Sequence, residues 1–156
     1  MKKDTQNTHG KFRLQVKDDV GNIVQDTGWL DNLGMNARLA VVAGLYGNTA
    51  SQTAFTYLAV GTDATAVNAS QTTLVAELTD TGLARHVATV SRATTNQTND
   101  TTQLTYTWTA SGSKTIQEIG YFNASSSGVM GGRSLTGSLV LQNLYQLIAT
   151  YQIIHT

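Results

Sequence analysis

The chain has 156 residues, with ten basic and ten acidic side chains and neither cysteine nor proline. The balanced charge gives no electrostatic reason to expect nucleic acid or an acidic membrane surface as a partner, and the lack of cysteine excludes disulfides and thiolate metal sites. The length fits one domain with a sizeable core, and no apolar run approaches the length of a membrane span. Charged residues are 13% of the chain, about half the usual share. A surface built from Thr, Ser, Asn and Gln suits packing against other protein, and equally an ordinary β-domain.

Residues 1–9 are predicted to be a flexible polar leader, and residues 10–156 a single domain. Residues 11–17 alternate apolar and polar side chains, residues 18–22 have turn chemistry, and residues 23–29 return as a second strand, which predicts a β-hairpin over residues 10–30. Its charged outer face suits either a projecting arm that reaches a neighbouring subunit or a hairpin folded onto its own sheet. The apolar positions of its first strand are Phe12, Leu14 and Val16.

One short helix is predicted near residues 33–46, centred on residues 35–45. Asp31 and Asn32 are the expected cap, and Gly44 or Gly47 the expected stop. The spacing of Leu39, Val42 and Ala43 indicates a buried face against a sheet.

Strands are expected at residues 54–60 and 83–92, separated by a polar loop at 62–73 and a single helical turn at 74–78. A run of Thr, Asn, Gln and Asp at residues 94–102 predicts a loop tip.

Residues 103–123 show the clearest alternation in the chain. Leu104, Tyr106, Trp108 and Ala110 fall on one face and threonines on the other, so we expect Trp108 in the core. Ser-Gly-Ser at 111–113 predicts a tight turn into a return strand at 115–122, which together form a hairpin. Gly120 lies among large residues, which indicates a bulge or the close approach of another backbone.

The remaining strands are expected at residues 129–135, 139–141 and 144–154. The last is apolar on both faces, which is typical of a strand covered on both sides. Many short strands with Gly and Ser turns and one short helix predict a mainly β fold, an antiparallel, jelly-roll-like β-sandwich.

No catalytic, cofactor-binding or metal-binding residues are predicted. The histidines, His9, His86 and His155, have no carboxylate or second histidine at ligand spacing. The two glutamates are Glu77 and Glu118. Glu118 with an aspartate is a conceivable glycosidase pair, but an ion pair with Arg85, Arg92 or Arg133 is the simpler expectation.

Several segments between residues 32 and 135 together resemble the phage tail-collar and tail-fibre N-terminal family. In that family a helix precedes an apolar strand ending near glycine, and a strand with a Glu-apolar-Gly-apolar-aromatic pattern precedes a turn and another apolar strand. The residues that carry the resemblance are 32–45, Phe55-Thr56-Tyr57-Leu58-Ala59-Val60-Gly61-Thr62, Thr73-Leu74 with Glu77, Leu83-Ala84-Arg85, Ile116-Gln117-Glu118-Ile119-Gly120-Tyr121-Phe122-Asn123 and Gly128-Val129-Met130.

The resemblance implies a virion structural role with no catalytic residues. Family members usually continue into a long fibre, whereas this chain ends at Thr156 and adds strands at 11–29, which favours a compact accessory or joining protein. We therefore expect a homo-oligomer, trimeric or higher, at the tail, collar or fibre attachment, with other virion proteins as partners and neither nucleic acid nor membrane.

Capsid decoration of the same virion is one alternative, and a carbohydrate- or receptor-binding module for a host-surface glycan is a second. Contacts are expected through sheet edges, the 10–30 hairpin and loops such as 94–102. The candidate contact residues are Phe12, Leu14, Val16, Trp29, Tyr121 and Phe122.

Overall fold

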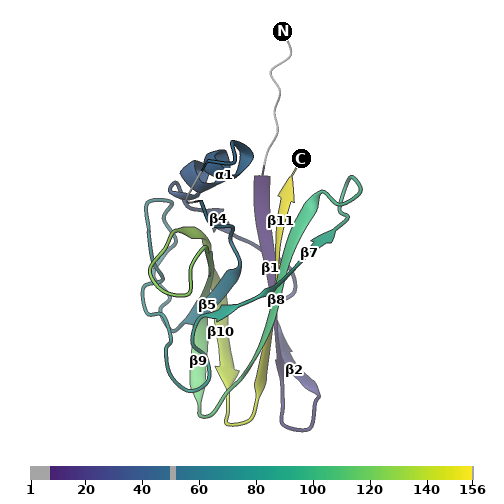
Figure 1. Ribbon diagram of the computed structural model, residues 1–156. Helices are drawn as coiled ribbons and strands as arrows, with labels where there is room; N and C mark the ends of the chain where they lie inside the picture. The colour runs from purple at the N-terminus through teal and green to yellow at the C-terminus, as the bar shows by residue number, and fades with distance from the viewer. Residues whose placement is uncertain (1–7, 50–51, 156) are drawn as a thin grey trace.

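The computed structural model describes residues 8–49 and 52–155, which form two antiparallel sheets packed face to face (Figure 1). The described elements are β1 (Thr8–Lys17), β2 (Ile23–Asp26), β3 (Leu30–Asp31), β4 (Leu33–Gly34), α1 (Arg38–Tyr46), β5 (Tyr57–Gly61), β6 (His86–Val87), β7 (Thr89–Ala93), β8 (Thr101–Thr109), β9 (Lys114–Phe122), β10 (Met130–Leu141) and β11 (Gln146–His155).

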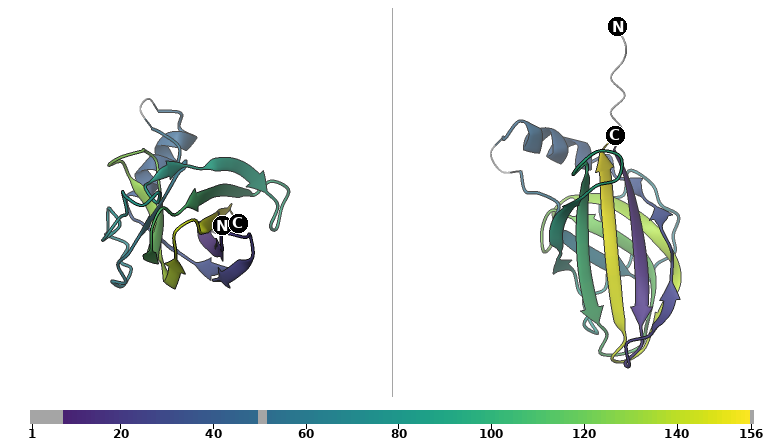
Figure 2. Two further views of the ribbon diagram at one scale, coloured as in Figure 1. Left: turned by 90° about the horizontal axis from the view of Figure 1, so that it is seen from below. Right: turned by 90° about the vertical axis from the view of Figure 1, so that its right-hand side faces the viewer.

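The first sheet has the order β2-β1-β11-β8-β7, with β3 also paired to β1, and the second has the order β4-β10-β9-β5-β6. Every pairing is antiparallel, which confirms the predicted mainly β sandwich with one short helix. Figure 2 shows the long strands β1, β11 and β8 side by side along the body, with α1 at one end and the β1–β2 turn at the other.

The main core lies between the two sheets and is filled by alternate side chains of their strands. Trp108 is among the largest of these; it is buried, and its indole N–H donates to the Ala84 carbonyl oxygen at 2.8 Å. This confirms the core position that the alternation in residues 103–110 predicts.

The predicted hairpin at residues 103–123 is wrong, although both of its strands exist. β8 pairs with β11 and β7, whereas β9 pairs with β10 and β5, so the Ser-Gly-Ser turn carries the chain from one sheet to the other. Alternation along a strand identifies its buried face but not its neighbour. Here both strands turn a buried face into the same core from opposite sides.

The N-terminal hairpin is confirmed and is folded onto its own sheet. β1 pairs with β11 along all ten of its residues, so it is an integral strand and not a projecting arm. Two residues of the expected leader, Thr8 and His9, belong to β1, and the rest of the leader lies outside the described residues.

Helix α1 begins later than predicted and is poorly buried. Its N-cap is Ala37, without a side-chain cap, because Asp31 belongs to β3 and Asn32 follows it where the chain passes from one sheet to the other. The predicted stop at Gly47 is confirmed. Within α1 only Val41 is buried, whereas Leu39 is 63% exposed, so the predicted buried face is wrong.

Three other strand predictions change in detail. The segment 83–92 divides at Ala88 into β6 of the second sheet and β7 of the first. The segments 129–135 and 139–141 join as β10 across a bulge. β11 has a buried inner face but a half-buried outer face, because no layer covers the outside of the first sheet there. No helical turn forms at residues 74–78.

The second sheet is covered on its outer face by the loop between β5 and β6. A small second core forms there, comprising Met35, Ala59, Leu74, Phe122 and Met130. The predicted close approach at Gly120 is confirmed, since a Cβ there would lie 3.0 Å from Leu74 Cδ2 and 3.1 Å from the Gly132 carbonyl oxygen. Among residues 8–49 and 52–155, no helix has the length and apolar character needed to cross a bilayer.

Candidate functional site

A buried ion pair joins two neighbouring strands of the second sheet, β10 and the central strand β9. Arg133 Nε on β10 lies 2.7 Å from Glu118 Oε2 on β9, and both side chains are fully buried. Glu118 also accepts hydrogen bonds from the backbone N–H groups of Val75, at 3.1 Å, and Ala76, at 2.7 Å. The carboxylate therefore anchors the loop after β5 to the sheet.

Arg133 extends this anchor to the start of the same loop. Its Nη1 donates to the Thr65 carbonyl oxygen at 2.9 Å and to Gln71 Oε1 at 3.2 Å, and Nη2 lies 4.0 Å from the Asp63 carboxylate. Gly61 is necessary for this arrangement, because a Cβ there would overlap both Glu118 Oε1 and the Ala76 carbonyl oxygen.

A second ion pair holds the end of the loop. Arg85 donates from Nε and Nη2 to the two carboxylate oxygens of Glu77, at 2.8 and 2.6 Å, and from Nη1 to the carbonyl oxygens of Ala124 and Ser127. Its guanidinium lies 3.5 Å from the centroid of the Phe122 ring, which adds a cation–π contact. Both glutamates of the chain thus accept from arginine, as the sequence suggested for Glu118.

His86 stacks on Tyr106 with ring centroids 4.1 Å apart. His155 lies where the end of β11 pairs with the start of β1, next to His9, and its Nδ1 lies 3.4 Å from Thr8 Oγ1. Within the described ranges, no group of three or more His, Cys, Asp or Glu side chains is placed to hold a metal ion.

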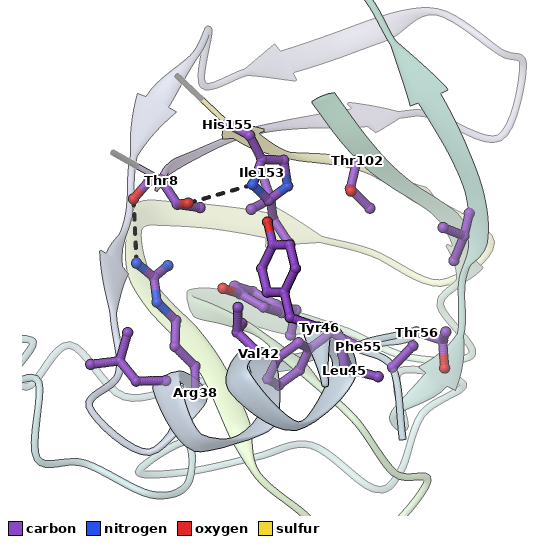
Figure 3. A pocket seen from close by; sticks show the side chains of 14 residues that line it. Thr8, Arg38, Val42, Leu45, Tyr46, Phe55, Thr56, Thr102, Ile153 and His155 are labelled. Atoms are coloured by element: carbon purple, nitrogen blue, oxygen red, sulfur yellow. Dashed lines mark hydrogen bonds between the residues drawn. The ribbon is translucent and has the colours of Figure 1, made fainter. Parts of the chain in front are cut away.

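An apolar pocket lies between α1 and the neighbouring ends of β1, β8 and β11 (Figure 3). We call it the α1 pocket; it has a volume of about 390 Å³, within the range of ligand-binding pockets. Its lining is Thr8, Arg38, Leu39, Val42, Leu45, Tyr46, Ala54, Phe55, Thr56, Val90, Thr102, Tyr121, Ile153 and His155.

The sequence did not predict the α1 pocket, because its walls come from segments far apart along the chain. One local signal was available: the helix sequence Arg-Leu-Ala-Val-Val-Ala-Gly-Leu-Tyr is apolar nearly all round and carries no acidic residue. Such a helix cannot bury every apolar side chain on one sheet, so part of its surface remains exposed.

Five of the six candidate contact residues belong to the core and are corrected here. Phe12, Leu14 and Val16 point inward from β1, and Tyr121 and Phe122 are buried on opposite faces of β9. A strand with one buried face turns its apolar residues inward, so their apolar character reflects packing within the chain. Trp29 differs: it is 43% exposed, and Lys11 Nζ lies 4.8 Å from the centroid of its ring.

Comparison of this chain with models of known protein families, with curated proteins and with solved structures finds no match.

Proposed function

We propose that the protein is a structural component of a tailed-phage virion, a homo-oligomeric tail, collar or fibre-attachment protein that acts through protein–protein contacts. One observation carries the proposal: the segments that carry the resemblance meet at one place in the fold. β5, the loop with Glu77, Arg85 and the Glu118 strand β9 are joined by the two arginine–glutamate pairs. The residues of the shared pattern therefore belong to one packed unit, which supports the proposal.

The sheet edges support a role in assembly. β7 is an edge strand of five largely exposed residues, and β2 at the other edge is exposed as well. An unpaired edge offers its backbone N–H and C=O groups to a neighbouring strand, and contact between copies covers such edges. Exposed apolar side chains lie on or beside these edges, at Ile23, Val24 and Val90.

We further propose a trimer or higher oligomer, with other virion proteins as partners, no cofactor and no reaction to catalyse. The neutral, Thr-rich surface supports this, because copies without a net charge do not repel one another. Both glutamates are engaged in ion pairs with arginines that hold the loop after β5.

Capsid decoration of the same virion fits the same observations and differs only in location. A carbohydrate-binding role is the second candidate, and the exposed ring of Trp29 favours it. Glycan-array binding that the substitution Trp29→Ala abolishes would establish that role, and an unchanged or absent array signal would remove it.

The most direct test is quantitative mass spectrometry of purified phage particles from the strain that encodes the chain. We expect the protein in the particles at a fixed ratio to the other structural proteins, resistant to washing in high salt. Its absence from intact particles, with the protein present only in the cell lysate, would refute the proposal.

A further inference from the structure

We propose that copies of this chain bind head to tail, with the β1–β2 turn of one copy seated in the α1 pocket of the next. The hairpin tip consists of residues 18–22, between β1 and β2. This inference rests on the self-assembly proposed above and specifies one of its contacts.

The α1 pocket has the properties of a receptor for an apolar group with a nearby negative charge. Its walls are mainly aliphatic and aromatic side chains of α1, Phe55 and Ile153 (Figure 3). Arg38 is the cation of the lining; it donates to the Thr8 carbonyl oxygen at 3.3 Å and has no carboxylate partner within residues 8–49 and 52–155. The described lining contains no Asp or Glu, so the pocket favours an anion.

The hairpin tip has the complementary properties. Val20 is 77% exposed and is the apolar side chain of the turn Asp18-Asp19-Val20-Gly21-Asn22. Asp19 beside it is exposed, so the tip presents an aliphatic side chain next to a carboxylate. Exposed apolar side chains at a loop tip that is otherwise polar are natural anchors for an apolar pocket.

The tip is also held in one conformation before binding. Asp18 Oδ1 accepts hydrogen bonds from the backbone N–H groups of Val20, at 3.1 Å, and Asn22, at 2.8 Å, and the Gly21 N–H donates to the Asp18 carbonyl oxygen. A preformed turn loses little conformational entropy when it docks, which strengthens a small contact.

The hairpin tip and the α1 pocket lie at opposite ends of the body, so the tip of one copy cannot enter the pocket of the same copy. β1 runs from Thr8 at the pocket to Lys17 beside the tip (Figures 1 and 2). Its ten residues span roughly 33 Å. Because the tip and the pocket are different surfaces, the contact between copies is heterologous. Repeating it produces a ring if the rotation from one copy to the next adds up to a full turn, and an open stack if it does not.

A cysteine cross-linking experiment tests this contact, because the natural chain contains no cysteine. Val20→Cys and Leu45→Cys chains are mixed with diamide as the oxidant, and the rate of mixed-dimer formation is followed on a non-reducing gel. Leu45 lines the pocket and is partly exposed. The control partner is Val87→Cys, an exposed position on β6 outside the pocket lining. Thermal unfolding of each variant verifies that it is folded.

We expect the Val20→Cys and Leu45→Cys pair to cross-link at least about tenfold faster than the control pair, since a disulfide requires Cα atoms within about 7 Å. Adding Asp19→Lys to the Val20→Cys chain should slow the reaction severalfold, with Asp19→Asn intermediate, because the charge facing Arg38 is reversed or removed. Equal rates for both pairs, or faster joining of two Val20→Cys tips to each other, would overturn the contact.

The failure of this contact is distinguishable from the failure of the proposed function. If the wild-type chain forms oligomers in solution but the two pairs cross-link at the same rate, the head-to-tail contact is wrong and self-assembly stands. If the chain is monomeric at every concentration and no pair cross-links preferentially, both are refuted.

Discussion

Glu118 and Arg133 form the ion pair on which the loop covering the second sheet depends. They are fully buried, and the carboxylate holds two backbone N–H groups of the loop in addition to the guanidinium. A buried charge is tolerated only where a partner and hydrogen bonds replace water, and removing one partner leaves the other without compensation. Glu118 therefore holds the loop after β5 in place.

Replacing Glu118 by alanine should lower the free energy of unfolding by about 3–5 kcal/mol, because the buried Arg133 guanidinium loses its buried carboxylate partner and keeps only the longer contact with Asp63. Urea unfolding followed by circular dichroism measures the change. Lys114→Ala, which breaks the exposed pair with Asp80, is the matched control and should cost far less. Equal losses in the two variants would contradict a buried, mutually compensated pair.

Trp108→Ala should also destabilise the fold, by about 3–5 kcal/mol, through the cavity that the lost indole leaves between the sheets. Trp108→Phe should recover most of that loss but not all, since the Ala84 carbonyl oxygen would lose its donor. Denaturant midpoints of the three proteins provide the comparison. A phenylalanine variant no more stable than the alanine variant would show that filling the cavity is not the dominant contribution.

At the scale of the elements, the loop between β7 and β8 is organised by one side chain. The Asp100 carboxylate accepts hydrogen bonds from the backbone N–H groups of Gln97 at 2.8 Å, Asn96 at 2.7 Å and Thr95 at 2.8 Å. These N–H donors, that of Gln97 first, hold the pKa of Asp100 well below its usual range. A composition that predicts only a polar loop thus produces an ordered tip.

The stabilisation by Asp100 should depend on pH in a defined direction. Because the pKa is lowered by folding, the contribution is fully present above the unfolded-state value near 4 and is lost as the pH falls below it. The difference in unfolding free energy between wild type and Asp100→Ala should therefore be constant near pH 7 and shrink below about pH 4. A difference that stays constant down to pH 2 would contradict this role.

Helix α1 should open more readily than the strands of the sandwich. It buries only Val41, whereas β11 is paired on both sides along most of its length. Native-state hydrogen exchange should show amides of residues 38–46 exchanging far faster than those of 146–155. Equal protection would mean that the helix is held by contacts that the described residues do not make.

The sequence predicts which segments form strands better than it predicts which strands pair with one another. Alternation correctly indicates a strand from residue 103 and the burial of Trp108, because side-chain direction in a strand is a local property, although β8 begins at Thr101, within the predicted loop tip. It could not show that β8 and β9 lie in different sheets, since pairing depends on residues far away in the chain. The predicted helix cap at Asp31 is wrong for the same reason, because pairing with β1 places Asp31 in β3.

The candidate site was predicted only in part. The sequence offers three arginines as possible partners of Glu118, and charge alone does not show that Arg133 is the one that pairs with it. Alternation shows that Phe12, Leu14 and Val16 share one face, but it does not show whether that face is covered by the same chain or by another, and here the chain's own second sheet covers it. The α1 pocket needs three separate segments at one end of the fold, which only the tertiary structure brings together.

At the scale of the whole molecule, the protein is a neutral sandwich with exposed features at its edges and at both ends. Open edges at β2 and β7, an apolar pocket at one end and an apolar tip at the other are distributed over different faces. A chain with several independent contacts can assemble strongly even if each contact is weak, because each bond raises the effective concentration for the next.

The central claim is that this chain functions as an assembly of its own copies, and its mass in solution tests that claim most directly. Multi-angle light scattering on the purified chain, over a wide range of concentration, should show a discrete species of at least three times the 16.7 kDa chain mass. A single species of one chain mass at every concentration would contradict the account.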